Sequence, residues 1–159
     1  MAFEFTPDRW ERFQEILSHY PPERKQAAML PTLHLAQEQN GYISPEVMEY
    51  VAQLLDVSPA QVLDVVTFYP MFFQEPVGKY IVRVCHTLPC ALCGCRKIIE
   101  HLTEKLGIGM EETTPDGKFT LLGVECLAAC NQGPVMMVNE ELYGNLTPEK
   151  VDEILDGLE

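Results

Sequence analysis

The six cysteines of this 159-residue sequence lie in two stretches, Cys85-His-Thr-Leu-Pro-Cys90-Ala-Leu-Cys93-Gly-Cys95 and Cys126-Leu-Ala-Ala-Cys130. Four residues separate Cys85 from Cys90, and three separate Cys126 from Cys130. Two separated pairs of thiols are the ligand set that an iron–sulfur cluster or a tetrahedral metal ion requires. The rest of the chain can be interpreted as support for these two stretches.

The segments around the cysteines alternate between strand and helix patterns. Residues 79–84 alternate in character, which predicts a strand that ends at Cys85. Residues 91–106 carry apolar side chains at helical spacing before Gly107, which predicts one helix. The other predicted elements are a hairpin of 109–112 with 119–124 around a turn at 114–117, strands at 135–138 and around 142–143, and a last helix capped by Thr147. This order is α/β and close to a thioredoxin-like arrangement of layers.

Both cysteine pairs follow predicted strands, and loops at strand ends are where α/β folds place their ligands. We therefore expect the two pairs to meet at one edge of the sheet. Cys90 is expected near the start of a helix, where free backbone N–H groups stabilise thiolates and can donate to cluster sulfurs.

Three kinds of site are compatible with this spacing. The C-x4-C and C-x3-C pairs suit a binuclear [2Fe–2S] centre, with two thiolates at each iron. A zinc site would use the C-x2-C of Cys90 and Cys93, and it would leave Cys85 unexplained. A dithiol oxidoreductase would use the same Cys90 and Cys93 and would need neither Cys126 nor Cys130. The spacing favours the iron–sulfur centre and leaves the other two open.

Composition limits the classes of function. The sequence has 24 acidic and 11 basic residues, a net charge of -13, which disfavours binding to nucleic acid or to an anionic membrane surface. No apolar run approaches the roughly 20 residues that span a bilayer, so no direct membrane insertion is expected. The first residues do not have the pattern of a signal peptide. Six cysteines without a secretory signal indicate metal binding or redox chemistry in a cytosol-type protein.

The first part of the chain predicts four short amphipathic helices in a small bundle. Helix starts are expected at Thr6-Pro7, Ser44-Pro45 and Ser58-Pro59, the last with a capping box to Gln61. A helix over 23–39 contains Pro31, which predicts a kink or a late start. The apolar segment 68–73 is interpreted as packing between two halves rather than as a partner contact. The expected domains are a helical bundle over 1–76 and a thioredoxin-like domain over 77–159.

Two sets of motifs carry a resemblance to a known family. Cys85-His-Thr-Leu-Pro-Cys90 with Glu125-Cys126-Leu-Ala-Ala-Cys130-Asn-Gln-Gly-Pro134 resembles the thioredoxin-like [2Fe–2S] ferredoxins. More closely, the chain resembles the flavoprotein 2 family, the E subunits of NADH–quinone oxidoreductase, respiratory complex I. The helical half agrees through Leu33-His-Leu-Ala-Gln-Glu-Gln-Asn-Gly-Tyr-Ile-Ser44 and Val65-Val-Thr-Phe-Tyr-Pro-Met-Phe72, so the resemblance covers nearly the whole chain.

The resemblance implies that Cys85, Cys90, Cys126 and Cys130 are the ligands of one [2Fe–2S] cluster. It implies an electron-transfer subunit of an oxidoreductase, with no complete active site on this chain alone. The FMN and NADH are then expected on a flavin- and NADH-binding partner subunit, beside other subunits of the peripheral arm on the cytoplasmic side of a membrane. The same domain pair occurs in some NAD-linked hydrogenases and formate dehydrogenases. A zinc-stabilised interaction module is the alternative from another class.

Cys93 and Cys95 depart from the family's ligand set. At least one of them is interpreted as a buried small apolar residue, and a stand-in ligand or half of a nearby disulfide are the other options. His86 has no counterpart beside the second pair, which disfavours a mixed ligand set of the Rieske type. A cis bond at Gly133-Pro134 and an ordinary proline at a strand entry are equally compatible with the sequence.

Overall fold

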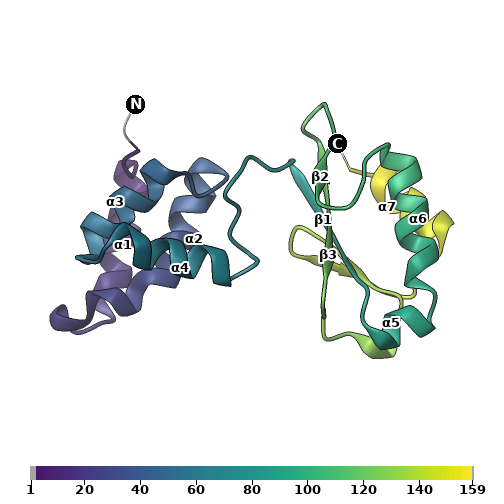
Figure 1. Ribbon diagram of the computed structural model, residues 1–159, viewed down its shortest axis with the longest axis horizontal. Coiled ribbons are helices and arrows are strands. Elements are labelled where there is room, and N and C mark those ends of the chain that lie inside the picture. The colour runs from purple at the N-terminus through teal and green to yellow at the C-terminus, as the bar shows by residue number, and fades with distance from the viewer. Residues whose placement is uncertain (1–2, 159) are drawn as a thin grey trace. The chain divides into compact units, whose positions relative to one another are not determined.

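In the computed structural model, which describes residues 3–158, internal contacts divide the chain into two units, Met1–Pro76 and Val77–Glu159 (Figure 1). The first unit is helical, and the second contains a sheet with helices. This confirms the predicted fold class, a helical part followed by an α/β part. Among the described residues, no single helix has both the length and the apolar character to cross a membrane. The helices Pro45–Leu55 and Pro59–Phe68 reach that length and character only as a pair bent by 117°.

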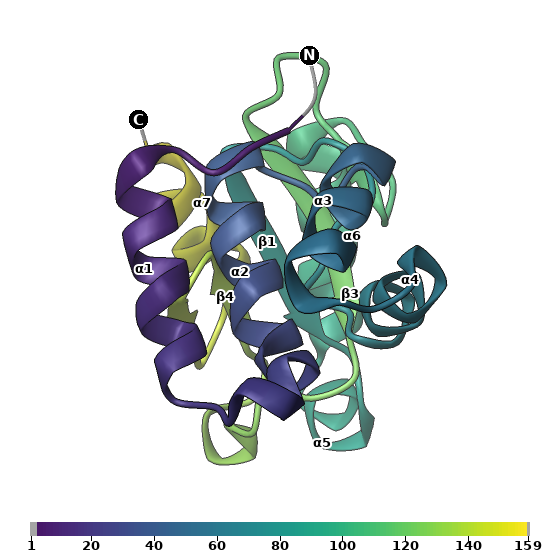
Figure 2. The ribbon, with the colours of Figure 1, turned by 90° about the vertical axis from the view of Figure 1, so that its left-hand side faces the viewer.

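In the described part of the helical unit there are four α-helices and one 3-10 helix. Ser44 begins one helix by accepting a hydrogen bond from the N–H of Val47, and Ser58 forms the predicted capping box with Gln61. A proline occupies the first turn of both helices. A backbone N–H at that position would have no hydrogen-bond partner inside the helix, so proline loses no hydrogen bond there. The elements are α1 (Pro7–Ser18), η1 (Pro22–Ala28), α2 (Met29–Asn40), α3 (Pro45–Leu55) and α4 (Pro59–Phe68), and Figure 2 shows α1 beside α2.

Two predicted helix starts differ in detail from the structure. The helix expected from residue 23 starts late, because 22–28 form the 3-10 helix η1 and α2 begins at Met29. Pro31 then lies in the first turn of α2, where proline is tolerated. Thr6 stands at the start of α1 without a capping bond. Its hydroxyl donates instead to the Asp8 carboxylate at 2.6 Å.

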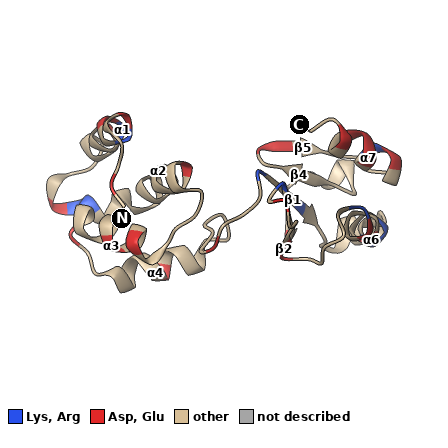
Figure 3. Ribbon diagram, turned by 90° about the horizontal axis from the view of Figure 1, so that it is seen from above, with Lys and Arg blue, Asp and Glu red and all other residues tan. Residues whose placement is uncertain are grey.

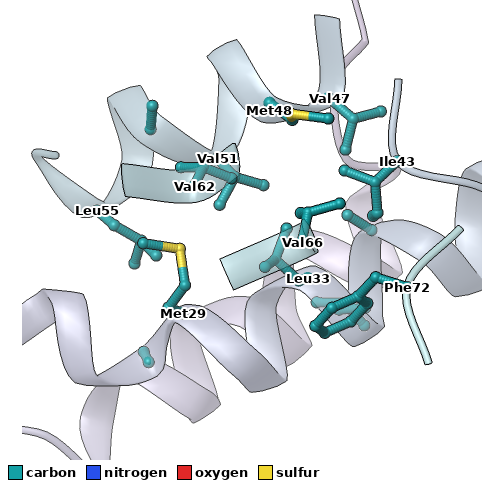
Figure 4. Close-up of a cluster of buried hydrophobic side chains, with 14 of the residues drawn as sticks. Met29, Leu33, Ile43, Val47, Met48, Val51, Leu55, Val62, Val66 and Phe72 are labelled. Atoms are coloured by element: carbon teal, nitrogen blue, oxygen red, sulfur yellow. The ribbon is translucent and has the colours of Figure 1, made fainter. Parts of the chain in front are cut away.

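The core of the helical unit is formed by apolar side chains from α1, α2, α3 and α4 and from the segments beside them, and Figure 4 shows part of it. Within the segment 68–73, Phe72 is buried in this core and Phe68 is exposed. Packing inside the helical unit therefore explains why the chain has an apolar residue at Phe72, but it does not explain the exposed Phe68. The labelled members of the core are Met29, Leu33, Ile43, Val47, Met48, Val51, Leu55, Val62, Val66 and Phe72.

The second unit is built on a five-stranded sheet in the order β2-β3-β1-β4-β5. β1 pairs parallel with β3 and antiparallel with β4. Helices lie on one side of the strands (Figure 1), and Val82 and Val84 of β1 pack there in one cluster with Leu102 of α6. The elements are β1 (Tyr80–Cys85), α5 (Leu88–Leu92), α6 (Cys95–Leu106), β2 (Glu112–Thr113), β3 (Phe119–Val124), η2 (Cys130–Gln132), β4 (Met136–Val138), β5 (Glu141–Tyr143) and α7 (Pro148–Asp156).

The helix predicted over 91–106 is two helices in the structure. Pro89 lies in the first turn of α5, which starts the helical backbone before Cys90, and Gly94 then breaks it with a φ of 92°. A side chain disfavours this left-handed conformation, so glycine permits the break. The bond between Gly133 and Pro134, left open by the sequence, is cis.

Candidate metal centre

The two cysteine loops leave the same edge of the sheet. Cys85 is the last residue of β1 and lies opposite Val124, the last residue of the parallel strand β3. Cys126 follows β3 by two residues, and η2 begins at Cys130. Parallel pairing therefore brings both loops to one edge, as the strand pattern predicts.

The first pair is buried. Cys85 and Cys90 belong to a small cluster with Cys95, Ala129 and Val135 that is separate from the core beneath α6 and α7. The Sγ of Cys85 lies 3.4 Å from the Thr87 hydroxyl and 3.7 Å from the carbonyl oxygen of Glu125. The second contact joins the first cysteine loop to the second.

The two buried thiols differ in acidity. Burial raises the pKa of Cys85, but hydrogen bonds with the hydroxyl and N–H of Thr87 and with Cys90 outweigh it, so this pKa lies below the ordinary cysteine value. At Cys90 burial and the hydrogen bond with Cys85 raise the pKa to about 11. Cys85 is thus the more easily ionised of the two, and a bound metal ion removes the proton from both.

The second pair is exposed. The N–H of Ala128 donates to the Sγ of Cys126 at 3.2 Å. Ala128 adopts a left-handed conformation with a φ of 54°, which is uncommon for a residue with a side chain. The loop therefore holds a strained backbone that directs an N–H group to a cysteine sulfur.

Cys93 and Cys95 have different surroundings. Cys95 is buried at the start of α6, and burial followed by the nearby Cys85 raises its pKa. Cys93 is exposed, and its Sγ lies 3.1 Å from the position that a Cβ on Gly133 would take. All six cysteines are free, so neither takes part in a disulfide. Cys95 matches the interpretation of one extra cysteine as a buried apolar residue.

The donor set fits a binuclear cluster. Within residues 3–158, no group of three or more His, Cys, Asp or Glu side chains is placed to hold a metal ion, which distinguishes neither kind of centre. A mononuclear zinc site takes four donors around one ion, whereas a [2Fe–2S] centre takes two thiolates at each iron. Cys85 and Cys90 are close enough to hydrogen bond with each other, and Cys130 lies near enough to raise the pKa of Cys90. His86 is 4.0 Å from the Glu125 carboxylate.

Two groups of the site were not predicted from the sequence. The Thr87 hydroxyl contacts Cys85, and the Ala128 N–H contacts Cys126. Thr87 precedes Leu88-Pro89 at the start of α5, and Thr before a proline is a helix-start signal that could have revealed it. The hydrogen bond from the Ala128 N–H depends on a left-handed backbone conformation, and an alanine in a sequence does not predict that conformation.

A mixed sheet with helices and a cysteine-bearing edge defines the class of this protein as a thioredoxin-like domain joined to a helical unit. The family model for the thioredoxin-like [2Fe-2S] ferredoxin matches residues 13–159. The NADH-quinone oxidoreductase E subunit of Rickettsia bellii is 45% identical over 98% of this chain and 94% of its own length. NADH-quinone oxidoreductase subunit 2 of Thermus thermophilus is 41% identical over 97% of this chain and 86% of its own length.

The chain therefore belongs to the thioredoxin-like [2Fe–2S] ferredoxin family and, with these relatives, to the family of NADH-quinone oxidoreductase E subunits. This confirms the resemblance found in the sequence motifs. Among solved structures, the H2-reduced NAD+-reducing [NiFe]-hydrogenase matches with a TM-score of 0.72 at 19% identity. The match covers 80% of this chain and 22% of that one, and it shows a common fold.

Proposed function

We propose that this chain is the electron-transfer E subunit of a NADH–quinone oxidoreductase and that it carries one [2Fe–2S] cluster. The observation that carries the proposal is the meeting of two cysteine pairs at one edge of a thioredoxin-like sheet, in a chain 45% identical to the E subunit of Rickettsia bellii. When bound, a [2Fe–2S] cluster accepts and returns one electron.

The proposed ligands are Cys85, Cys90, Cys126 and Cys130. Cys85 and Cys90 supply a buried pair with one easily ionised thiol. Cys126 and Cys130 supply an exposed pair, supported by the Ala128 N–H. Hydrogen bonds to ligand sulfurs and burial of the ligands are the means by which a protein adjusts the reduction potential of such a centre. Thr87 and Ala128 take this role here.

The proposed partner is the flavin- and NADH-binding subunit of the same complex, with other subunits of the peripheral arm. NADH and FMN bind there, since this sequence contains no glycine-rich phosphate loop. The proposed location is the peripheral arm of a membrane-bound complex, on its cytoplasmic side in a bacterium. The 45% identity to the Rickettsia bellii protein favours this assignment over the equivalent subunit of an NAD-linked hydrogenase or formate dehydrogenase.

The proposal is tested by co-purifying the chain anaerobically with its flavin- and NADH-binding subunit and adding NADH or dithionite. We expect an electron paramagnetic resonance signal of a reduced [2Fe–2S] cluster after dithionite, and the Cys85→Ser variant should lack it. Partial reduction by NADH would support electron exchange with the flavin. A colourless preparation that contains zinc and no sulfide would instead support the zinc-stabilised module.

A further inference from the structure

The second cysteine loop, residues 125–132, buries little of its own surface. Ala129 is its one buried residue, Leu127 is half-buried, and both Cys126 and Cys130 are exposed. Segments with few buried contacts open more readily than the core of a domain. The position of the two exposed cysteines therefore depends on the bonds that join this loop to other parts of the sheet unit.

The support segment, residues 144–146 after β5, supplies two of these bonds. The N–H of Asn145 donates to the carbonyl oxygen of Gln132 at 2.5 Å, and the N–H of Leu146 donates to the carbonyl oxygen of Pro134 at 3.1 Å. Gln132 ends η2, the short helix that begins at Cys130. Two consecutive N–H groups thus hold the chain directly after the exposed cysteine pair.

The support segment lies between η2 and the core of the sheet unit. Gly144 approaches η2 closely, since a Cβ at this position would lie 2.5 Å from the Cβ of Gln132 and 2.8 Å from its Oε1. Leu146, two residues later, is buried in the same core cluster as Val151 of α7. The segment therefore links the loop that holds Cys130 to the core.

Lys150 fixes the support segment to α7. Its Nζ donates to the carbonyl oxygen of Gly144 at 2.6 Å, in a partly buried contact. Its N–H donates to the hydroxyl of Thr147, which caps the helix, and the next residue, Val151, is completely buried. The backbone of Lys150 is therefore held firmly. Lys150 is the one basic residue of α7, on which Figure 3 shows acidic segments.

We propose that Lys150 is a positioning residue for the exposed cysteine pair. Its ammonium group holds the carbonyl of Gly144, so that the N–H groups of Asn145 and Leu146 keep Cys130 in place for the cluster. The inference rests on the proposed function, because it assigns a role toward the proposed ligand Cys130. A hydrogen bond from a charged donor is stronger than a neutral one, and partial burial limits competition from water.

The test compares Lys150→Met with Lys150→Arg in the full chain, purified anaerobically. Lys150→Met removes the donor and keeps a side chain of similar length. Its iron should be released to a chelator on the order of tenfold faster, because loss of a charge-assisted hydrogen bond lets the loop open more often. The N–H groups of Asn145 and Leu146 should also exchange with deuterium faster than in the wild type.

The electron paramagnetic resonance spectrum after dithionite separates positioning from general stability. In Lys150→Met its principal g-values should shift, because the geometry of the ligands changes. Lys150→Arg restores a charged donor and should recover the wild-type spectrum and rate of iron release.

Lys118→Met is the matched control. The Nζ of Lys118 donates to the carbonyl oxygen of Leu158 at 2.8 Å, also in a partly buried contact, but it does not hold the support segment. This variant loses the same kind of bond, so its resistance to urea should fall about as much as that of Lys150→Met. Its iron release and its spectrum should stay as in the wild type.

Wild-type iron release and spectrum in folded Lys150→Met would overturn the role of Lys150 and leave the proposed function intact. The same changes in Lys118→Met would trace the effect to general stability and would also overturn it. A wild-type chain that contains no cluster would overturn the proposed function and this inference together.

Discussion

The helical unit, Met1–Pro76, contains no cysteine, whereas the sheet unit, Val77–Glu159, holds all six at one edge of its sheet. In the helical unit, the described helices are defined by local signals and by an apolar core. In the sheet unit, a comparable core lies beneath α6 and α7, and Cys85, Cys90 and Cys95 belong to a second, smaller buried cluster. Stability and chemistry are thus separable in this chain, and substitutions can address one at a time.

The largest expected effect is on the proposed ligands. Ser in place of Cys85 or Cys126 removes a thiolate, so iron and acid-labile sulfide should fall to a small fraction of the wild-type content. Cys93→Ser, at an exposed cysteine outside the proposed ligand set, is the matched control and should keep both. Metal and sulfide analysis of anaerobically purified protein checks this. A Cys126→Ser variant with full iron and sulfide would refute its assignment as a ligand.

A core substitution in the helical unit should reduce stability without changing the centre. Leu33 is completely buried, and Leu33→Ala should lower the free energy of unfolding by about 2–5 kcal/mol, since it removes apolar contacts and leaves a cavity. Leu63→Ala, at a leucine that is 42% exposed, should change it by less than about 0.5 kcal/mol. Denaturant titration measures both. The cluster absorption per folded chain should stay constant, and a loss in Leu33→Ala would show that the two units are coupled.

A substitution at Gly144 tests whether the second cysteine loop depends on close packing inside the sheet unit. A Cβ at this position would lie 2.5 Å from the Cβ of Gln132 and 3.1 Å from its carbonyl oxygen. Gln132 ends η2, which begins at Cys130, so Gly144→Ala should cost about 1–3 kcal/mol and disturb the second cysteine loop. In Gly109→Ala the atoms nearest to the new Cβ would belong to the flexible side chain of Glu112, at 3.3 Å or more, so this control should be milder. Equal stability and equal iron content in the two variants would contradict the expectation.

The smallest expected effect is a pH dependence between α6 and α7. The pKa of Asp152 is lowered, first by its hydrogen bond with His101 at 2.8 Å and then by Lys105. A lowered carboxyl pKa stabilises the folded state above the ordinary pKa of about 4, and this contribution is lost as pH falls through the lowered value. Asp152→Asn should therefore be less stable than the wild type at neutral pH.

The stability difference between Asp152→Asn and the wild type should shrink as pH falls towards 3, as followed by urea unfolding at each pH. Asp64→Asn, at an exposed aspartate of the helical unit, is the control. A difference that stays constant with pH would exclude the carboxylate of Asp152 as its source.

The sequence predicts the helical unit well, because its signals are local. Ser58 and Gln61 form their capping box within four residues of chain, and Pro31 accounts for the late start of α2. The position of both cysteine loops at one edge of the sheet follows from the strand pattern, because the parallel strands before them end at the same edge. The break between α5 and α6 was missed, because apolar spacing continued across Gly94. The Ala128 contact was missed for another reason, since it depends on backbone geometry and not on residue type.

The central claim is that one [2Fe–2S] cluster is held by Cys85, Cys90, Cys126 and Cys130, without Cys93 or Cys95. The most direct measurement is iron and acid-labile sulfide per chain, with the electron paramagnetic resonance spectrum after dithionite, in the Cys93→Ser/Cys95→Ser double variant. The account predicts two iron and two sulfide per chain and the wild-type reduced spectrum. Loss of the signal in the folded double variant, or iron and sulfide at a small fraction of the wild-type content, would contradict it.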